Sequence, residues 1–121
     1  MEVGFIGIGT MGQPMAANIL AAGNSLKVHD KNRNAANPLV EAGALWCEDI
    51  TTVVNGCEAV MLSLPGPKEV ELVAKEALRT MRSGQTLVDM STNSPALVKQ
   101  LSSAAAKKGV EFLDAPVSGG I

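Results

Sequence analysis

The residues that decide the fold are Val3-Gly4-Phe5-Ile6-Gly7-Ile8-Gly9-Thr10-Met11-Gly12, close to the amino terminus. This stretch predicts a strand that runs directly into the pattern G-x-G-x-x-G and then into a helix. In that context Gly7 permits a tight turn, and Gly12 lets the helix pack closely on the strand. An ordinary glycine-rich turn is the alternative, but it does not need a strand before it and a helix after it.

The middle glycine points to an anionic ligand. Gly9 would let the backbone come close to a pyrophosphate. The amides of Thr10 and Met11 would point at that anion from the helix amino terminus, where the helix dipole is positive.

The rest of the chain alternates between apolar runs of strand length and longer stretches of helical character. The runs are mostly continuous, as is typical of strands that are covered on both faces. Strands are predicted at 3–8, 26–30, 44–47, 59–64, 86–90 and 110–113. Helices are predicted at 11–22, from an Asn37-Pro38 cap to about Gly43, at 50–54, at 68–81, and from a Ser94-Pro95 cap to Lys108.

This alternation predicts an α/β fold with right-handed crossovers. We expect a Rossmann-type, doubly wound and mainly parallel sheet of about six strands, with helices on both faces.

Composition narrows the class of protein. The 121 residues suit one domain, taken as 1–121, and the formal charge is −2. Lys and Arg form no stripe, so a nucleic acid or an anionic membrane has no electrostatic support as a partner. We expect no membrane span and no leader. Cys47 and Cys57 form no metal or redox motif, so we expect no metal site and a cytoplasmic location, where thiols stay reduced.

Asp30 ends the second predicted strand, at the spacing from the glycine loop where an acidic residue can bind ribose hydroxyls. A carboxylate there favours NAD because it repels a 2′-phosphate. Lys31 and Arg33 follow at once and could accommodate that phosphate, so NADP stays possible. For Lys31 and Arg33 we prefer the plainer interpretation of a solvated turn, and His29 is interpreted as structural.

Two further loops follow predicted strands, where ligands of open α/β sheets bind. Pro65-Gly66-Pro67 makes a rigid turn, and residues 91–95 carry hydroxyl and amide groups. Both loops could border the nicotinamide half of a groove. Both could equally be common turn and cap chemistry.

Four motifs in order resemble one family. Residues 4–16 resemble its opening G-F-I-G-L-G-x-M-G-x-P-M-A, Leu64-Pro65 its L-P turn, Asp89-Met90-Ser91-Thr92 with Pro95 its D-x-S-T-x-x-P loop, and residues 114–120 its D-A-P-V-S-G-G. The family is that of the β-hydroxyacid dehydrogenases, which includes 3-hydroxyisobutyrate dehydrogenase, tartronate semialdehyde reductase, glyoxylate/succinic semialdehyde reductases and, more distantly, 6-phosphogluconate dehydrogenase.

The resemblance implies roles for individual residues. The dinucleotide would be held by Gly7, Ile8, Gly9, Thr10, Met11, Gly12 and Asp30, and its ribose-nicotinamide part by Leu64, Pro65 and Thr92. Ser118, Gly119 and Gly120 would bind a substrate carboxylate. Some members have Asn where this chain has Glu69, so no role is carried to Glu69. NADP-preferring members have Asn-Arg after the second strand, and Asp30-Lys31 here favours NAD.

The family's general acid/base is a lysine beyond the S-G-G loop, and Lys99, Lys107 and Lys108 do not match it. We therefore interpret these three as solvated and expect no catalytic residue in the chain. The resemblance implies a truncated enzyme that lacks a helical carboxy-terminal domain, acts on a small hydroxyacid or semialdehyde and forms homo-oligomers when whole. The alternative is a non-catalytic dinucleotide-binding module for sensing or assembly.

Overall fold

The computed structural model describes residues 1–116. Within them, six strands form one sheet in the order β3-β2-β1-β4-β5-β6, and every pairing is parallel. The strands are β1 (Glu2–Ile6), β2 (Ser25–His29), β3 (Leu45–Trp46), β4 (Ala59–Leu62), β5 (Thr86–Asp89) and β6 (Glu111–Asp114). The expected Rossmann-type sheet is confirmed.

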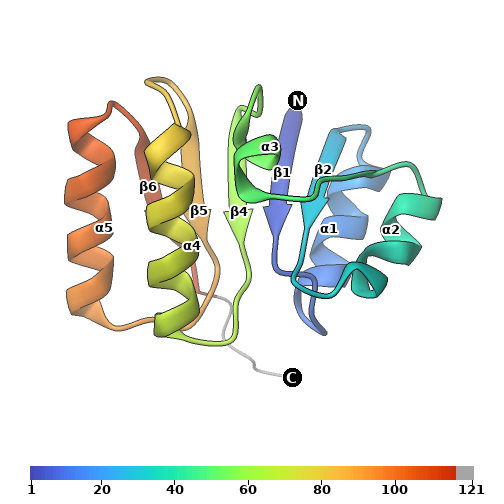
Figure 1. Cartoon of the computed structure of the whole chain (residues 1–121), viewed down its shortest axis with the longest axis horizontal. Helices are drawn as coiled ribbons and strands as arrows, with labels where there is room; N and C mark the ends of the chain where they lie inside the picture. Colours follow the sequence, from blue (N-terminus) through green and yellow to red (C-terminus); the bar gives the residue numbers. More distant parts are fainter. Residues whose placement is uncertain (117–121) are drawn as a thin grey trace.

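Helices cover both faces of this sheet. They are α1 (Gly12–Ala21), the short 3₁₀ helix η1 (Arg33–Ala36), α2 (Asn37–Glu41), α3 (Ile50–Val54), α4 (Pro67–Thr80) and α5 (Pro95–Lys107). The helices α1 and α2 contact each other on one face, whereas α3, α4 and α5 form a row on the other (Figure 1).

Two hydrophobic clusters, one on each face, hold the layers together. Val3 and Phe5 of β1 pack with Ala16 of α1, and Ile6 packs on the opposite face with Val53 of α3. This alternation follows from the pleat, because successive side chains of a strand point to opposite faces. Phe5 and Val53 are fully buried.

The strand order creates a crevice between β1 and β4. From β1 the chain moves outward to β2 and β3, and it then returns to the other side of β1 to form β4. The connections that leave β1 and β4 therefore run in opposite directions. A crevice opens between them at the carboxyl ends of the strands, which lie at the lower edge of the sheet in Figure 1.

The predicted elements are present, with differences at their ends. β1 ends at Ile6 and not at residue 8, because Gly7 turns the chain with a φ of 98°. The predicted Asn37-Pro38 cap is wrong. Asn37 is already helical, since the chain first turns through η1, where the Asn32 side chain accepts from the Asn34 amide. The predicted cap of α5 is confirmed, because Ser94 Oγ accepts from the Leu97 amide at 3.2 Å.

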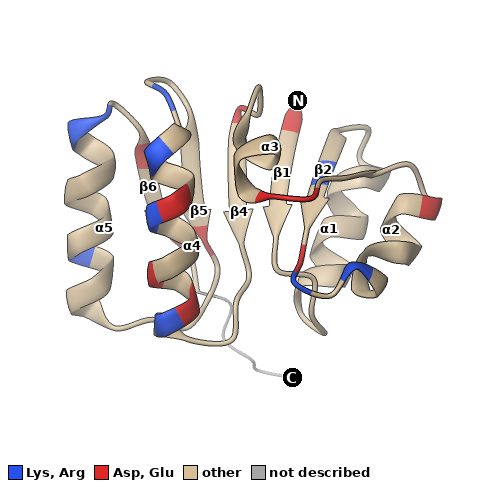
Figure 2. Cartoon of the chain, viewed as in Figure 1, with Lys and Arg blue, Asp and Glu red and all other residues tan. Residues whose placement is uncertain are grey.

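Charged residues are spread over several elements. Lys and Arg occur on β2, α4 and α5 among others, and on α4 they alternate with Glu (Figure 2). Glu71 and Lys75 of α4 form an ion pair of 2.7 Å one helical turn apart. Among residues 1–116, no helix has both the length and the apolar character needed to cross a membrane.

Candidate functional site

A groove of about 480 Å³ lies at the carboxyl ends of β1, β2 and β4. It occupies the crevice that the strand order creates. Its walls are the loop after β1, the end of β2, the turn after β4 and the first turns of α4. The lining residues are Ile6, Gly7, Ile8, Gly9, Thr10, Met11, Gly12, His29, Asp30, Lys31, Ile50, Ser63, Leu64, Pro65, Glu69, Leu72 and Val73.

The three glycines of the loop are required for different reasons. A Cβ on Gly7 would clash with the carbonyl oxygen of Ser63, and one on Gly12 would clash with the carbonyl oxygen of Gly7. The fold itself therefore requires glycine at both positions. A Cβ on Gly9 would meet no other atom of residues 1–116 within 4 Å, and its φ is not positive. Among the described residues nothing requires glycine at this position, whereas a ligand that comes close to this backbone would require it.

The start of α1 presents its backbone amides to the same space. The Gln13 amide donates to the Gly9 carbonyl at 2.9 Å and closes the first turn. Thr10 and Met11 are exposed, and their amides have no hydrogen-bond partner among residues 1–116. The first turn of α1 contains no acidic residue. Free amides at the positive end of a helix dipole suit an anion.

The carboxylate of Asp30 is fixed against the glycine loop. Its Oδ2 accepts from the Ile8 amide at 2.6 Å, and its Oδ1 accepts from the Asn32 amide at 2.8 Å. The Gly7 amide also donates to the His29 carbonyl at 3.1 Å, which continues the β1–β2 pairing up to the groove. Each carboxylate oxygen can accept more than one hydrogen bond, so Asp30 keeps acceptor capacity for a ligand hydroxyl.

The polar loop after β5 positions one wall of the groove through hydrogen bonds. Ser91 is buried, and its Oγ accepts from the Leu64 amide at 2.8 Å, which positions the turn after β4. Asp89 is fully buried and accepts from the Ser91 amide at 2.9 Å and from Asn93 Nδ2 at 2.7 Å. Leu64 and Pro65 line the groove as predicted, whereas Thr92 is exposed and lies outside its lining.

Sequence reasoning missed the apolar wall and the support network. Ile50, Leu72 and Val73 line the same groove as the glycine loop, and Leu72 is 68% exposed. A large apolar side chain on the solvent side of a polar helix was the available signal. For Ser91 the signal was Asp89 at the end of a buried strand, because a buried carboxylate needs nearby donors.

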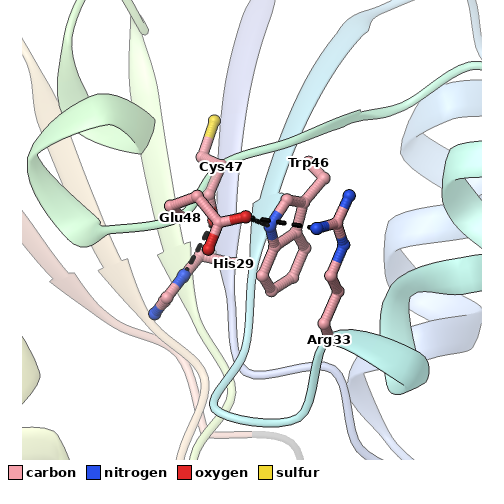
Figure 3. A network of polar contacts seen from close by, with 5 residues as sticks. All are labelled: His29, Arg33, Trp46, Cys47 and Glu48. Carbon is pink, nitrogen blue, oxygen red and sulfur yellow. Dashed lines mark hydrogen bonds and ion pairs between the residues drawn. The ribbon is translucent and has the colours of Figure 1, made fainter.

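The basic residues after β2 are exposed, as predicted for a solvated turn, but they have different surroundings. Lys31 lines the groove, but the Arg33 guanidinium pairs with Glu48 at 3.3 Å and lies over the Trp46 ring (Figure 3). His29 also lines the groove, and its Nδ1 hydrogen-bonds the Cys47 carbonyl at 2.9 Å, which fits a structural role.

Lys108 is exposed but not simply solvated. Its Nζ donates to the carbonyls of Leu78 and Arg79 and so satisfies the carboxyl end of α4. The residue is exposed, as predicted, and it has this additional structural role because packing brings the end of α5 against the end of α4.

Cys47 and Cys57 are buried free thiols, and burial raises the pKa of each. Residues 1–116 contain no group of three or more His, Cys, Asp and Glu that could hold a metal ion. Ser118, Gly119 and Gly120 lie outside the residues that the structure describes.

Comparison with known proteins decides the family. Residues 2–121 match the family described as the NAD binding domain of 6-phosphogluconate dehydrogenase. The chain belongs to this family. The chain spans about two fifths of the length of the curated relatives that it matches.

Two relatives come from Pseudomonas aeruginosa. A 3-hydroxyisobutyrate dehydrogenase is 39% identical over 99% of this chain and 41% of its own length. An NAD-dependent L-serine dehydrogenase is 38% identical over 98% of this chain and 41% of its own length. A solved structure of Mycobacterium tuberculosis 3-hydroxyisobutyrate dehydrogenase with L-serine superposes with a TM-score of 0.92 and 30% identity, over 98% of this chain and 41% of that chain.

The groove fits the dinucleotide that the family name implies. The open space at Gly9 leaves room for a close approach to the backbone, and the amides beside it suit a pyrophosphate. The fixed carboxylate of Asp30 suits ribose hydroxyls. The residues present therefore match the chemistry of NAD(P).

Proposed function

We propose that this chain binds NAD(H) in the groove and is the cofactor-binding part of an oxidoreductase acting on a β-hydroxyacid. One observation carries the proposal. Gly9 is a glycine that the packing of residues 1–116 does not require, at the position where a dinucleotide pyrophosphate requires one.

The contacts of the groove support a placement for each part of the cofactor. The amides of Thr10 and Met11 receive the pyrophosphate, and Asp30 accepts from the adenosine ribose. Ile50, Leu72 and Val73 offer an apolar surface for the adenine. Leu64 and Pro65 border the nicotinamide half. Thr92 is assigned to the same half from the resemblance alone, since it lies outside the groove lining.

NAD is the preferred cofactor in this proposal. The carboxylate of Asp30 lies at the end of β2, where it would repel the 2′-phosphate of NADP. The relative described as an NAD-dependent L-serine dehydrogenase supports the same preference.

The names of the relatives support the substrate class. 3-Hydroxyisobutyrate and L-serine both carry a hydroxymethyl group on the carbon that bears the carboxylate. We propose that the whole enzyme oxidises such an alcohol to the semialdehyde, and that bound nicotinamide supplies the hydride acceptor. Ser118, Gly119 and Gly120 bind the substrate carboxylate in this proposal.

The proton transfer is assigned to a lysine outside residues 1–121, as the resemblance to the β-hydroxyacid dehydrogenases implies. In support, Lys99, Lys107 and Lys108 lie on α5 or at its end and are absent from the groove lining. Residues 1–121 therefore form the cofactor domain of a longer homo-oligomeric enzyme, and this domain alone does not turn over. The buried free thiols of Cys47 and Cys57 support a cytoplasmic location.

Titration with NADH, followed by its fluorescence, tests the cofactor assignment. The wild-type chain should bind, and Gly9→Val should lose binding by at least about tenfold because its side chain fills the approach to the backbone. The variant should keep its circular dichroism and melting temperature, since a Cβ at position 9 meets no other atom of residues 1–116 within 4 Å and the φ of Gly9 is not positive.

Ala17→Val is the matched control, because it adds a valine side chain to an exposed position of α1 outside the groove lining. It should bind NADH like the wild type. Wild-type affinity in a folded Gly9→Val protein would contradict the proposal.

A further inference from the structure

A cluster of three side chains lies beside His29, a residue that lines the groove, because the Trp46 ring is 5.5 Å from the His29 ring. We name Arg33, Trp46 and Glu48 the arginine clamp (Figure 3). The Arg33 Nη1 pairs with Glu48 Oε1 at 3.3 Å, and the guanidinium carbon lies 5.6 Å from the centre of the Trp46 ring. The Trp46 Nε1 donates to the same Glu48 Oε1 at 2.8 Å. One carboxylate oxygen therefore joins the arginine to the tryptophan.

The clamp holds Arg33 to one side of the groove. Arg33 begins η1, three residues after Asp30, and Trp46 ends β3, the edge strand beyond β2. His29, Asp30 and Lys31 line the groove, whereas Arg33 does not. Its guanidinium is instead directed across the loop towards Trp46 and Glu48, as Figure 3 shows.

An arginine in this loop has an obvious alternative partner. In dinucleotide-binding folds, an Arg near the end of the second strand accommodates the 2′-phosphate of NADP, and its planar fork matches phosphate oxygens. Without the clamp, Arg33 lies close enough in the chain to Asp30 to serve that purpose. The negative carboxylate of Glu48 competes with such a phosphate for the Arg33 guanidinium.

We propose that Glu48 and Trp46 hold Arg33 away from the adenosine ribose and thereby lower the affinity for NADP(H). This inference rests on the proposed function, and it goes beyond it by adding a second determinant of cofactor choice to Asp30. Glu48 acts through Arg33, so it is a positioning residue and does not contact the cofactor.

The expected effect is modest. The side chains of Arg33 and Glu48 are 67% and 75% exposed, and exposed ion pairs contribute little. The tryptophan ring adds a cation–π contact. Releasing Arg33 from such contacts should tighten NADPH binding about threefold to fivefold.

The test compares four proteins: the wild type, Glu48→Gln, Arg33→Ala and the double variant. Gln keeps an amide oxygen that can accept from Trp46 Nε1 but removes the charge that holds Arg33. Titrations with NADPH and NADH at one salt concentration give both dissociation constants. Glu48→Gln should tighten NADPH binding about threefold to fivefold and change NADH binding by less than about twofold.

The double variant identifies the cause. In the Arg33→Ala background, Glu48→Gln should leave NADPH affinity unchanged, because the released group is missing. Equal tightening in both backgrounds would mean that Glu48 merely repels the phosphate, and this would overturn the proposal. Glu41→Gln, which removes a charge from the exposed end of α2, is the control for long-range charge and should have no effect.

Failure of the two proposals can be distinguished. If the wild type binds NADH but Glu48→Gln does not change NADPH affinity, the role proposed for the arginine clamp is wrong and the proposed function is unaffected. If the folded wild type binds neither cofactor, both are wrong.

Discussion

The substitution Asp30→Asn removes one negative charge from the groove and keeps the size of the side chain. Both carboxylate oxygens accept backbone hydrogen bonds, from Ile8 at 2.6 Å and from Asn32 at 2.8 Å. An amide has one acceptor oxygen, so one of these bonds is lost. The free energy of unfolding should therefore fall by about 1–2 kcal/mol, which leaves the protein folded.

The effect on cofactor choice follows from two terms. A ribose hydroxyl that donates to a charged acceptor gains about 1 kcal/mol over a neutral one, so NADH binding should weaken about fivefold. Two unit charges 4 Å apart repel by about 1 kcal/mol in water and more inside a protein, so NADPH binding should tighten about fivefold to thirtyfold in this open groove. The ratio of the two dissociation constants should change by roughly 25-fold to 150-fold.

Isothermal titration calorimetry with both cofactors measures this ratio. Asp49→Asn is the matched control, because Asp49 is a nearby carboxylate that caps α3 and is absent from the groove lining, and Asn also caps helices well. A wild type that prefers NADPH, or a ratio that Asp30→Asn leaves unchanged, would refute the role given to Asp30.

Two predictions concern stability. Asp89→Ala should lower the free energy of unfolding in urea by about 2–4 kcal/mol, because it leaves the Ser91 amide and the Asn93 side chain without their acceptor. Asp114 is the register partner of Asp89 on β6 but is exposed, so Asp114→Ala should lower the free energy of unfolding by less than about 0.5 kcal/mol. Equal losses of stability in the two variants would contradict the role given to Asp89. Burial raises the pKa values of the Cys47 and Cys57 thiols above their values in the unfolded chain. The contribution of the neutral thiols to the free energy of unfolding is therefore complete below about pH 8, and it is lost as the pH rises through the folded pKa values. Urea unfolding between about pH 7 and 10 should show this loss, and the Cys47→Ala/Cys57→Ala protein should lose less over that interval.

Local patterns were sufficient for the elements and for part of the site. The alternation of apolar runs with helical stretches depends on neighbours within a few residues, and glycine, proline and serine mark the ends of the elements. Gly7, Gly9 and Gly12 could be assigned in the same way, because their roles follow from one strand–turn–helix unit. Asp30 was predictable as well, since a βαβ unit sets the distance between the glycine loop and the end of the second strand.

Contacts between distant segments required the tertiary structure. The Ser91 hydroxyl meets the Leu64 amide across 27 positions of sequence, and Arg33 meets Glu48 across 15. No local pattern encodes such pairs, because they depend on which strands become neighbours and how their loops pack. For the same reason the hydrogen bonds of Lys108 to the end of α4 could not be predicted from the sequence. Sequence alone therefore determined a dinucleotide-binding sheet with its glycine loop and acidic residue, whereas the fold decided which polar side chains face the groove and which are already bound elsewhere.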